Sequence, residues 1–209
     1  MPPNVTFEQA AAVPVAGMTA LQALRDVGAV QAGQRVLITG AGGGIGTFAV
    51  QIAKSLGAEV TGVCSTAKVD LVRSLGADHV IDYTREDFTG GERCYDVILD
   101  NAGTHSLAAA RRALAQRGTL IPNDGKFENR WLASLPTILW ASLLSLVVAQ
   151  RLRPFISLPN TANLLALRAL LESGKVKPVV GKAYPLAEAR AAFAEFGRGH
   201  VTGKIVLTV

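Results

Sequence analysis

The sequence predicts an α/β fold built on a doubly wound parallel sheet whose strands follow the order 3-2-1-4-5-6. Short apolar runs with branched side chains, the pattern of strands buried on both faces, alternate with helical segments along most of the chain. A glycine-rich turn joins the first of these strands to the helix that follows it. Right-handed crossovers and a reversal after the third strand give the stated order.

A helical lead-in is expected before the sheet. Thr6–Gln9 has the pattern of a capping box, which starts a helix, and Pro14 breaks this helix before it resumes over about Gly17–Val27. The lead-in takes residues 1–30, and residues 31–209 are expected to form a dinucleotide-binding domain. No low-complexity linker marks a second domain, so a single domain is expected overall.

The other elements are placed by composition and periodicity. Short runs rich in branched and aromatic side chains predict strands at Val36–Ile38, Glu59–Cys64, His79–Ile81, Tyr95–Asp100 and Thr119–Pro122. Apolar residues at helical spacing predict helices at Phe48–Leu56, Val69–Leu75, Ser106–Gln116, Leu164–Leu171 and Ala187–Phe196. Val176–Val180 is expected to supply the sixth strand of the sheet, and Lys204–Val209 a closing strand.

Composition and charge argue against several classes of protein. Of the 209 residues, 49% are hydrophobic and 18% are charged, which argues against a disordered or fibrous chain. The formal net charge of +5 comes from scattered residues, so nucleic acid is not an expected partner. Cys64 and Cys94 form no CxxC motif, which argues against a disulfide framework and a zinc site. No secretory signal opens the sequence, and the cytoplasm is the expected location.

One long apolar stretch allows two interpretations. Leu132–Ala149 contains 18 residues without a charge, which is the lower limit of length for a membrane span. Pro136 and several hydroxyl side chains interrupt this stretch, and Arg151 and Arg153 follow it at once. These features favour a helix that is buried or lies at a subunit interface over a membrane span, and they lead us to expect a homodimer.

The glycine-rich turn after the first strand is the strongest functional signal. Five glycines fall within Gly40–Gly46, and Ala41, Gly43 and Gly46 fit the dinucleotide fingerprint with alanine in its first position. Small residues let the backbone approach a pyrophosphate, whose charge the free N–H groups and the helix dipole stabilise. The strand before the turn and the helix after it supply the context of this Rossmann-type motif. The residues expected to bind the cofactor here are Gly40, Gly43, Gly44, Ile45 and Gly46.

Four segments in the right order resemble the medium-chain dehydrogenase/reductase superfamily, in its zinc-independent quinone oxidoreductase branch. They are AAAVPVAGMTALQAL, VLITGAGGGIGTFAVQIAKSLGAEV, SLGADHVIDY and VTGKIVLTV. Members of that family carry a barrel-like domain before the position of Met1, and this domain forms much of the substrate cleft. The resemblance therefore implies the cofactor-binding part of such an enzyme, incomplete for catalysis on its own, which is either an excised half or a naturally short relative.

The short-chain dehydrogenases are the rival family. Their glycine motif fits Thr39–Gly46, and Asn101–Gly103 resembles their Asn-Ala-Gly sequence. Those enzymes need a Tyr-x-x-x-Lys pair, in which the lysine lowers the pKa of the tyrosine. The residues four positions after the three tyrosines of this chain are Asp87, Leu99 and Glu188. Because no such pair exists, the short-chain family is the weaker alternative.

The residues after the second strand favour NADP(H) over NAD(H). NAD enzymes present Asp or Glu to the ribose 2′-hydroxyl at this place, whereas this chain has Ser65, Thr66 and, just beyond them, Lys68. Hydroxyls and a cation suit a 2′-phosphate, which a carboxylate would repel. The resemblance adds Tyr83, at a position where family members also contact that phosphate. The alternative for Ser65 and Thr66 is that they cap the following helix.

Two asparagines are expected near the nicotinamide. Asn101 ends the fourth strand and Asn123 follows the fifth, so both face the crevice beyond the strand ends, although a plain turn explains Asn123 equally well. His79, His105 and His200 show no metal spacing, and neither a metal site nor a catalytic side chain is expected. The resemblance implies hydride transfer from NADP(H) to a quinone or to an activated alkene or carbonyl. The alternative is a non-catalytic NADPH-binding sensor or interaction module.

Overall fold

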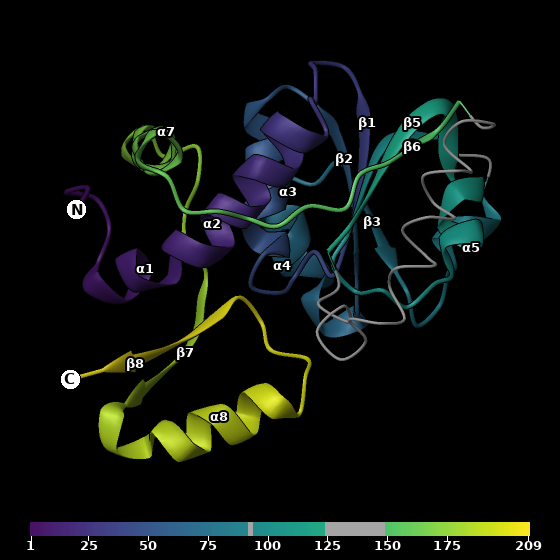
Figure 1. The fold of residues 1–209 in the computed structure, drawn as a ribbon. Coiled ribbons are helices and arrows are strands. Elements are labelled where there is room, and N and C mark those ends of the chain that lie inside the picture. Colours follow the sequence, from purple (N-terminus) through teal and green to yellow (C-terminus); the bar gives the residue numbers. More distant parts are fainter. Residues whose placement is uncertain (92–93, 124–148) are drawn as a thin grey trace.

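The sheet at the centre of the molecule has six parallel strands. The structure, a computed structural model, describes residues 1–91, 94–123 and 149–209. The strands follow the order β3-β2-β1-β4-β5-β6, which confirms the doubly wound α/β fold expected from the sequence (Figure 1). Their bounds are β1 Arg35–Thr39, β2 Glu59–Cys64, β3 His79–Asp82, β4 Tyr95–Asp100, β5 Leu114–Pro122 and β6 Arg151–Leu152.

The central strands form where branched apolar side chains are buried on both faces of the sheet. β1 pairs in parallel with β2 on one side and with β4 on the other. Successive side chains of a strand point to opposite faces, and β1 accordingly feeds two apolar clusters. Val36 and Ile38 enter the larger cluster, whereas Leu37 enters the smaller one. Burial on both faces explains why this run is continuously apolar and does not alternate with polar residues.

Helices cover both faces of the sheet (Figure 1). On one face, Phe48 of α3 and Val72 of α4 belong to the larger cluster. On the other face, Ala110 of α5 belongs to the smaller cluster. The helices are α1 Phe7–Ala12, α2 Pro14–Leu21, α3 Gly46–Ser55, α4 Val69–Ser74, α5 Leu107–Arg112, α7 Thr161–Glu172 and α8 Ala189–Gly197. A π-helix, η1, covers Gln22–Val27, and single 3-10 turns cover η2 Thr66–Lys68, η3 Phe88–Gly90 and η5 Leu186–Glu188.

The helical lead-in begins at the capping box that the sequence predicts. Thr6 Oγ1 accepts a hydrogen bond from the N–H of Gln9, and the N–H of Thr6 donates to Gln9 Oε1. The helix resumes at Pro14, earlier than the expected Gly17, because a proline in the first helical turn loses no hydrogen bond. α2 then packs against α3 and α7, which joins the lead-in to the core of the sheet.

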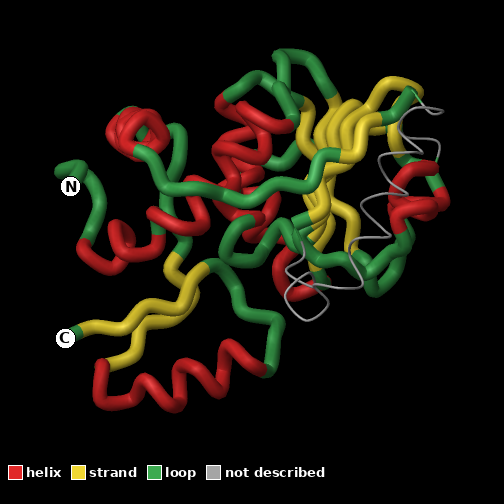
Figure 2. Tube along the Cα trace, viewed as in Figure 1, coloured by secondary structure: helices red, strands yellow, loops and turns green. Residues whose placement is uncertain are grey.

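A separate sheet of two parallel strands lies beside the large one. β7 Val180–Pro185 pairs with β8 Lys204–Thr208. α8 runs along this pair, and α1 packs against both strands, so the two chain termini lie on the same side of the molecule (Figure 2). Just before β8 the chain returns to the glycine-rich turn, where the N–H of Gly203 donates to the carbonyl oxygen of Gly42 over 3.0 Å.

The sixth strand is not the segment that the sequence suggests. β6 pairs with β5 through Thr119–Arg151 and Leu120–Leu152, whereas Val176–Val180 stays outside the large sheet. Val176 is buried under α7, and its N–H donates to the carbonyl oxygen of Leu170 at the end of that helix. The prediction was wrong because the valine-rich segment packs against α7, while the true strand is two residues long and contains no apolar run.

The boundary between α5 and β5 also differs from the prediction. The helix expected over Ser106–Gln116 ends at Arg112, and β5 begins at Leu114. Leu114 pairs with Tyr95 of β4 and fills the smaller apolar cluster. Pairing with β4 therefore overrides the local helical pattern, as tertiary contacts often do.

The long apolar stretch Leu132–Ala149 lies outside the described residues, apart from Ala149. Within the ranges that the structure describes, no helix combines the length and the apolar character that crossing a membrane requires.

Candidate cofactor site

The glycine-rich turn connects β1 to α3 and leaves the start of α3 open. Gly40 adopts a φ of 61°, in the left-handed region that favours glycine. α3 has no side chain that caps its N-terminus. Among the described residues, nothing accepts the N–H groups of Gly44, Ile45 and Gly46, although the neighbouring Gly43 and Thr47 are bonded within the turn. Unpaired N–H groups at the positive end of a helix suit an anion, so the turn fits a pyrophosphate.

Gly46 is a glycine because the turn folds back on itself. A Cβ at this position would lie 2.1 Å from the carbonyl oxygen of Gly40 and 2.6 Å from the Cα of Ala41. Both atoms belong to the backbone, which cannot swing aside as a side chain does. The last glycine of the fingerprint therefore permits the turn itself, whereas Gly44 and Ile45 supply its open donors.

Two lysine side chains lie against the turn. A Cβ on Gly42 would be 2.7 Å from Cδ of Lys68, and a Cβ on Gly44 would be 2.7 Å from Cδ of Lys204. Lys68 Nζ donates to the carbonyl oxygen of Val201 over 2.8 Å, and burial lowers the pKa of Lys68. Neither lysine forms an ion pair with a carboxylate in the described part of the chain. Two lysines that form no ion pair among the described residues thus lie beside the open donors of the turn.

The ends of β2 and β3 bring Ser65, Thr66 and Tyr83 together with Lys68. Ser65 follows β2 and makes no side-chain cap to η2, and nothing in the described chain bonds its hydroxyl. Thr66 Oγ1 donates to Asp82 Oδ2 over 2.5 Å, so this hydroxyl does not cap a helix either. Tyr83 is 50% exposed, and its N–H donates to the carbonyl oxygen of Cys64. Ser65 and Tyr83, at the ends of β2 and β3, therefore have hydroxyls with no partner among the described residues.

Asp82 is a feature of this site that the sequence analysis missed. It is the last residue of β3 and is only 8% exposed. Its carboxylate accepts hydrogen bonds from Thr66 and Thr84, and the bond from Thr66 is the main cause that lowers the pKa of Asp82. The signal in the sequence was an acidic residue at the end of a strand with a threonine, Thr84, two positions later.

Asn101 and Asn123 meet at the carboxyl ends of β4 and β5. Asn123 Nδ2 donates to Asn101 Oδ1 over 2.7 Å, and Asn101 Nδ2 donates to the carbonyl oxygen of Thr39 over 3.0 Å. Asp100, also missed, fixes the same corner, because its Oδ1 accepts hydrogen bonds from Thr39 Oγ1 and from the N–H of Gly103. These contacts place both asparagines at the carboxyl ends of the strands, where the glycine-rich turn also lies.

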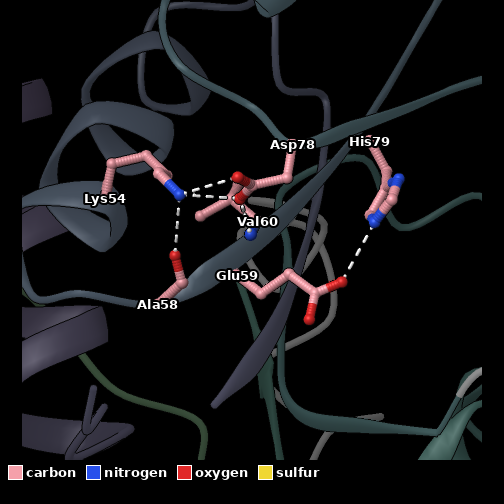
Figure 3. A network of polar contacts seen from close by, with 6 residues as sticks. All are labelled: Lys54, Ala58, Glu59, Val60, Asp78 and His79. Carbon is pink, nitrogen blue, oxygen red and sulfur yellow. Dashed lines mark hydrogen bonds and ion pairs between the residues drawn. The ribbon is translucent and has the colours of Figure 1, made fainter. Parts of the chain in front are cut away.

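A separate polar network lies at the amino ends of the strands, opposite the candidate cofactor site (Figure 3). Lys54 Nζ contacts both carboxylate oxygens of Asp78, and His79 Nε2 lies 3.0 Å from Glu59 Oε1. Glu59 begins β2 and His79 begins β3, so these residues lie at the amino ends of their strands. Glu59 therefore lies at the opposite end of β2 from the place where a ribose-binding carboxylate would act.

A cavity of about 680 Å³ follows the outer side of β3. Its wall is formed by β3, by the residues on either side of the strand, by Arg73 of α4 and by Tyr95 of β4, and none of the glycines of the turn lines it. His105, on the same side, contacts Asp87 over 3.2 Å and stacks edge-on against Phe88. The cavity is thus distinct from the candidate cofactor site.

Comparisons with known proteins agree with this geometry. A family model described as zinc-binding dehydrogenase matches residues 75–207. The mitochondrial NAD(P)H oxidoreductase RTN4IP1 of Mus musculus is 35% identical over all of this chain and 57% of its own length. The quinone oxidoreductase of Coxiella burnetii superposes with a TM-score of 0.83 at 28% identity, over 99% of this chain and 62% of that one. The mycobacterial Rv1454c complexed with NADPH superposes with a TM-score of 0.78 at 26% identity, over 100% and 66% of the two chains.

The match to a zinc-binding family does not extend to a zinc site in the described residues. No three His, Cys, Asp or Glu side chains come together there in a way that could hold a metal, and Cys64 is buried at the end of β2. The chain spans 57–66% of the lengths of the relatives named above. Within that span the glycine-rich turn, the strand order and the family match agree, and the chain belongs to the medium-chain dehydrogenase/reductase superfamily, in its quinone-oxidoreductase-like branch.

Proposed function

We propose that this chain binds NADP(H) as the cofactor-binding part of an oxidoreductase that transfers hydride to a quinone or to an activated alkene or carbonyl. One observation carries the proposal: three N–H groups at the start of α3 have no acceptor among the described residues, and the side chains of Lys68 and Lys204, which form no ion pair there, lie against the same turn. Charged donors and open backbone amides together favour a ligand with several phosphates.

The preference for NADP(H) over NAD(H) rests on the residues after β2. Ser65 and, just after the neighbouring strand, Tyr83 have hydroxyls without a partner among the described residues, and the ammonium group of Lys68 uses only one of its three protons on Val201. Among the described residues, Asp82 is the one carboxylate that contacts the η2 turn, and it is bonded to Thr66 and Thr84. A 2′-phosphate would therefore meet donors here.

In this proposal the residues of the chain bind the cofactor and orient it. The turn holds the pyrophosphate, the residues after β2 hold the ribose, and Asn101 with Asn123 positions the carboxamide end of the cofactor. The bound nicotinamide supplies the hydride chemistry. Positioning of an acceptor is worth about 7–11 kcal/mol of barrier. The relatives are longer than this chain, so we expect cofactor binding by the isolated chain together with little turnover.

Titration calorimetry with NADPH and NADH tests the assignment. We expect tighter binding of NADPH, and we expect Lys68→Met to weaken NADPH by about tenfold or more, as loss of a charge-assisted hydrogen bond does. Lys175→Met is the matched control, because Lys175 is exposed and contacts neither the turn nor β2. Equal affinity for both cofactors, or an equal loss of both in Lys68→Met, would contradict the assignment.

We propose further that the chain forms a homodimer in the cytoplasm. The uncharged stretch Leu132–Ala149 supports pairing, and so do Phe193 and Phe196 of α8, which expose large apolar surfaces. Cys64 and Cys94 are both free thiols, which suits a reducing compartment. Light scattering at micromolar concentration should give twice the mass of one chain, and a monomer would refute the pairing.

A further inference from the structure

Asp82 connects the ends of two strands beside the candidate cofactor site. It pairs in register with Cys64, so β2 and β3 end side by side. Asp82 Oδ2 accepts from Thr66 Oγ1 over 2.5 Å, and Arg85 Nε lies 3.6 Å from the same oxygen. Asp82 Oδ1 accepts from the N–H and the hydroxyl of Thr84, over 3.0 and 2.8 Å. Both oxygens of this largely buried carboxylate are thus occupied by protein donors.

Thr66 is turned toward the sheet, although the residue as a whole is exposed. Its hydroxyl has a single proton, which the bond to Asp82 uses, so Thr66 has no proton to donate to a ligand. Thr66 nevertheless begins η2, the 3-10 turn that separates Ser65 from Lys68. A contact that fixes Thr66 therefore fixes the segment that carries both groups.

The η2 turn has few other contacts that hold it. Two backbone hydrogen bonds span it, from the N–H of Lys68 to the carbonyl oxygen of Ser65 and from the N–H of Val69 to that of Thr66, and no side chain caps it. Outside the turn, Lys68 Nζ donates to the carbonyl oxygen of Val201, and the hydroxyls of Thr66 and Thr84 lie 3.1 Å apart. Restricting a short exposed turn when a ligand binds costs conformational entropy, and the bond from Thr66 to Asp82 reduces that cost before the ligand arrives.

We propose that Asp82 is a positioning residue, which sets the preference for NADP(H) by holding Thr66 and thereby placing Ser65 and Lys68 for the 2′-phosphate. The proposal rests on the function proposed above, because it assumes that this phosphate binds at the turn. A competing effect of Asp82 is electrostatic, because its carboxylate would repel a nearby phosphate and weaken binding. The hydrogen bonds on both oxygens and the nearby Arg85 make positioning the larger effect.

Two small ligands isolate the effect from the rest of the cofactor. Adenosine 2′,5′-bisphosphate carries the 2′-phosphate, whereas adenosine 5′-monophosphate lacks it. Calorimetry measures both with the full chain and with Thr66→Val, Thr66→Ser and Asp82→Asn. Thr66→Val keeps the shape of the side chain and removes the donor, and Thr66→Ser keeps the donor. Thr89→Val is the matched control, because Thr89 makes the same kind of bond to Asp87 on a turn away from η2.

We expect Thr66→Val and Asp82→Asn to weaken the bisphosphate by about tenfold, which is the scale of a hydrogen bond to a charged group. Affinity for the monophosphate should stay within about twofold, and Thr66→Ser and Thr89→Val should resemble the unmodified chain. Tighter bisphosphate binding by Asp82→Asn would show repulsion and overturn the proposal. Equal losses for both ligands would show a merely structural role and also overturn it.

The unmodified chain separates this proposal from the proposed function. If it prefers the bisphosphate and the variants keep that preference, only the role of Asp82 fails. If it binds both ligands equally, the assignment of NADP(H) fails together with the role of Asp82. Melting curves recorded for every variant confirm that each one is folded under the conditions of the titration.

Discussion

Replacing Gly46 by alanine should damage both the fold and the cofactor site. The new Cβ would lie 2.1 Å from the carbonyl oxygen of Gly40, more than 1 Å inside the ordinary contact distance of about 3.5 Å. It would also lie 2.6 Å from the Cα and 2.8 Å from the carbonyl carbon of Ala41. Relief requires movement of the β1–α3 connection itself, because no flexible side chain is among these atoms.

The expected cost lies at the upper end of the range for overpacking, about 3 kcal/mol. For a chain of this size, each kcal/mol lowers the melting temperature by about 2–4 °C, so Gly46→Ala should melt about 6–12 °C lower. Movement of the turn would also displace the N–H groups of Gly44 and Ile45, and NADPH affinity should fall at least tenfold. Gly90→Ala is the control, because a Cβ on Gly90 meets nothing within 4 Å. Unchanged melting and binding in Gly46→Ala would refute this account of the turn.

Three further outcomes are expected. NADPH affinity should fall relative to NADH affinity as the pH rises through the pKa of Lys68, which burial places below its ordinary value, because only the protonated amine pairs with the 2′-phosphate; parallel pH profiles would contradict this. Asn101→Ala should lower the affinity for intact NADPH about threefold to tenfold and leave the affinity for adenosine 2′,5′-bisphosphate unchanged, because it removes the contacts to Asn123 and Thr39 at the other half of the site. Calorimetry measures both affinities, and an equal loss for the two ligands would contradict this role of Asn101. Ile38→Ala should lower the free energy of unfolding by about 2–5 kcal/mol in a denaturant titration, because Ile38 is fully buried in the larger cluster; a loss below 1 kcal/mol would mean that the core is looser than the structure shows.

The fold was predictable where burial alone decides the structure. β2 and β4 have the bounds that the sequence predicts, because each is a short segment with branched side chains that is almost wholly buried and is followed by a polar residue. The sixth strand was not predictable in this way. Arg151–Leu152 becomes a strand only because β5 offers it a free edge, and nothing in the pair itself favours a strand.

The candidate site was predictable in its local parts. The glycine-rich turn, Ser65 and Lys68 follow from the spacing of residues along one βαβ unit. Other parts of the site depend on contacts between segments far apart in the sequence, which no local pattern predicts. These contacts join Lys68 to Val201 and Gly42 to Gly203. Thr66 shows most clearly what local spacing cannot predict. The sequence offered its hydroxyl as a donor to phosphate, whereas in the structure this hydroxyl donates to Asp82.

The return of the chain to the glycine-rich turn has a consequence for the order of folding. The turn, β1 and α3 are neighbours in sequence, so the contacts among them are local and require little loop closure. The bond between Lys68 and Val201 closes a loop of 133 residues, and the entropy of closing it must be met before the bond contributes anything. We therefore expect the cofactor site to be completed late in folding, when the segment that holds Val201 and Gly203 reaches the glycine-rich turn.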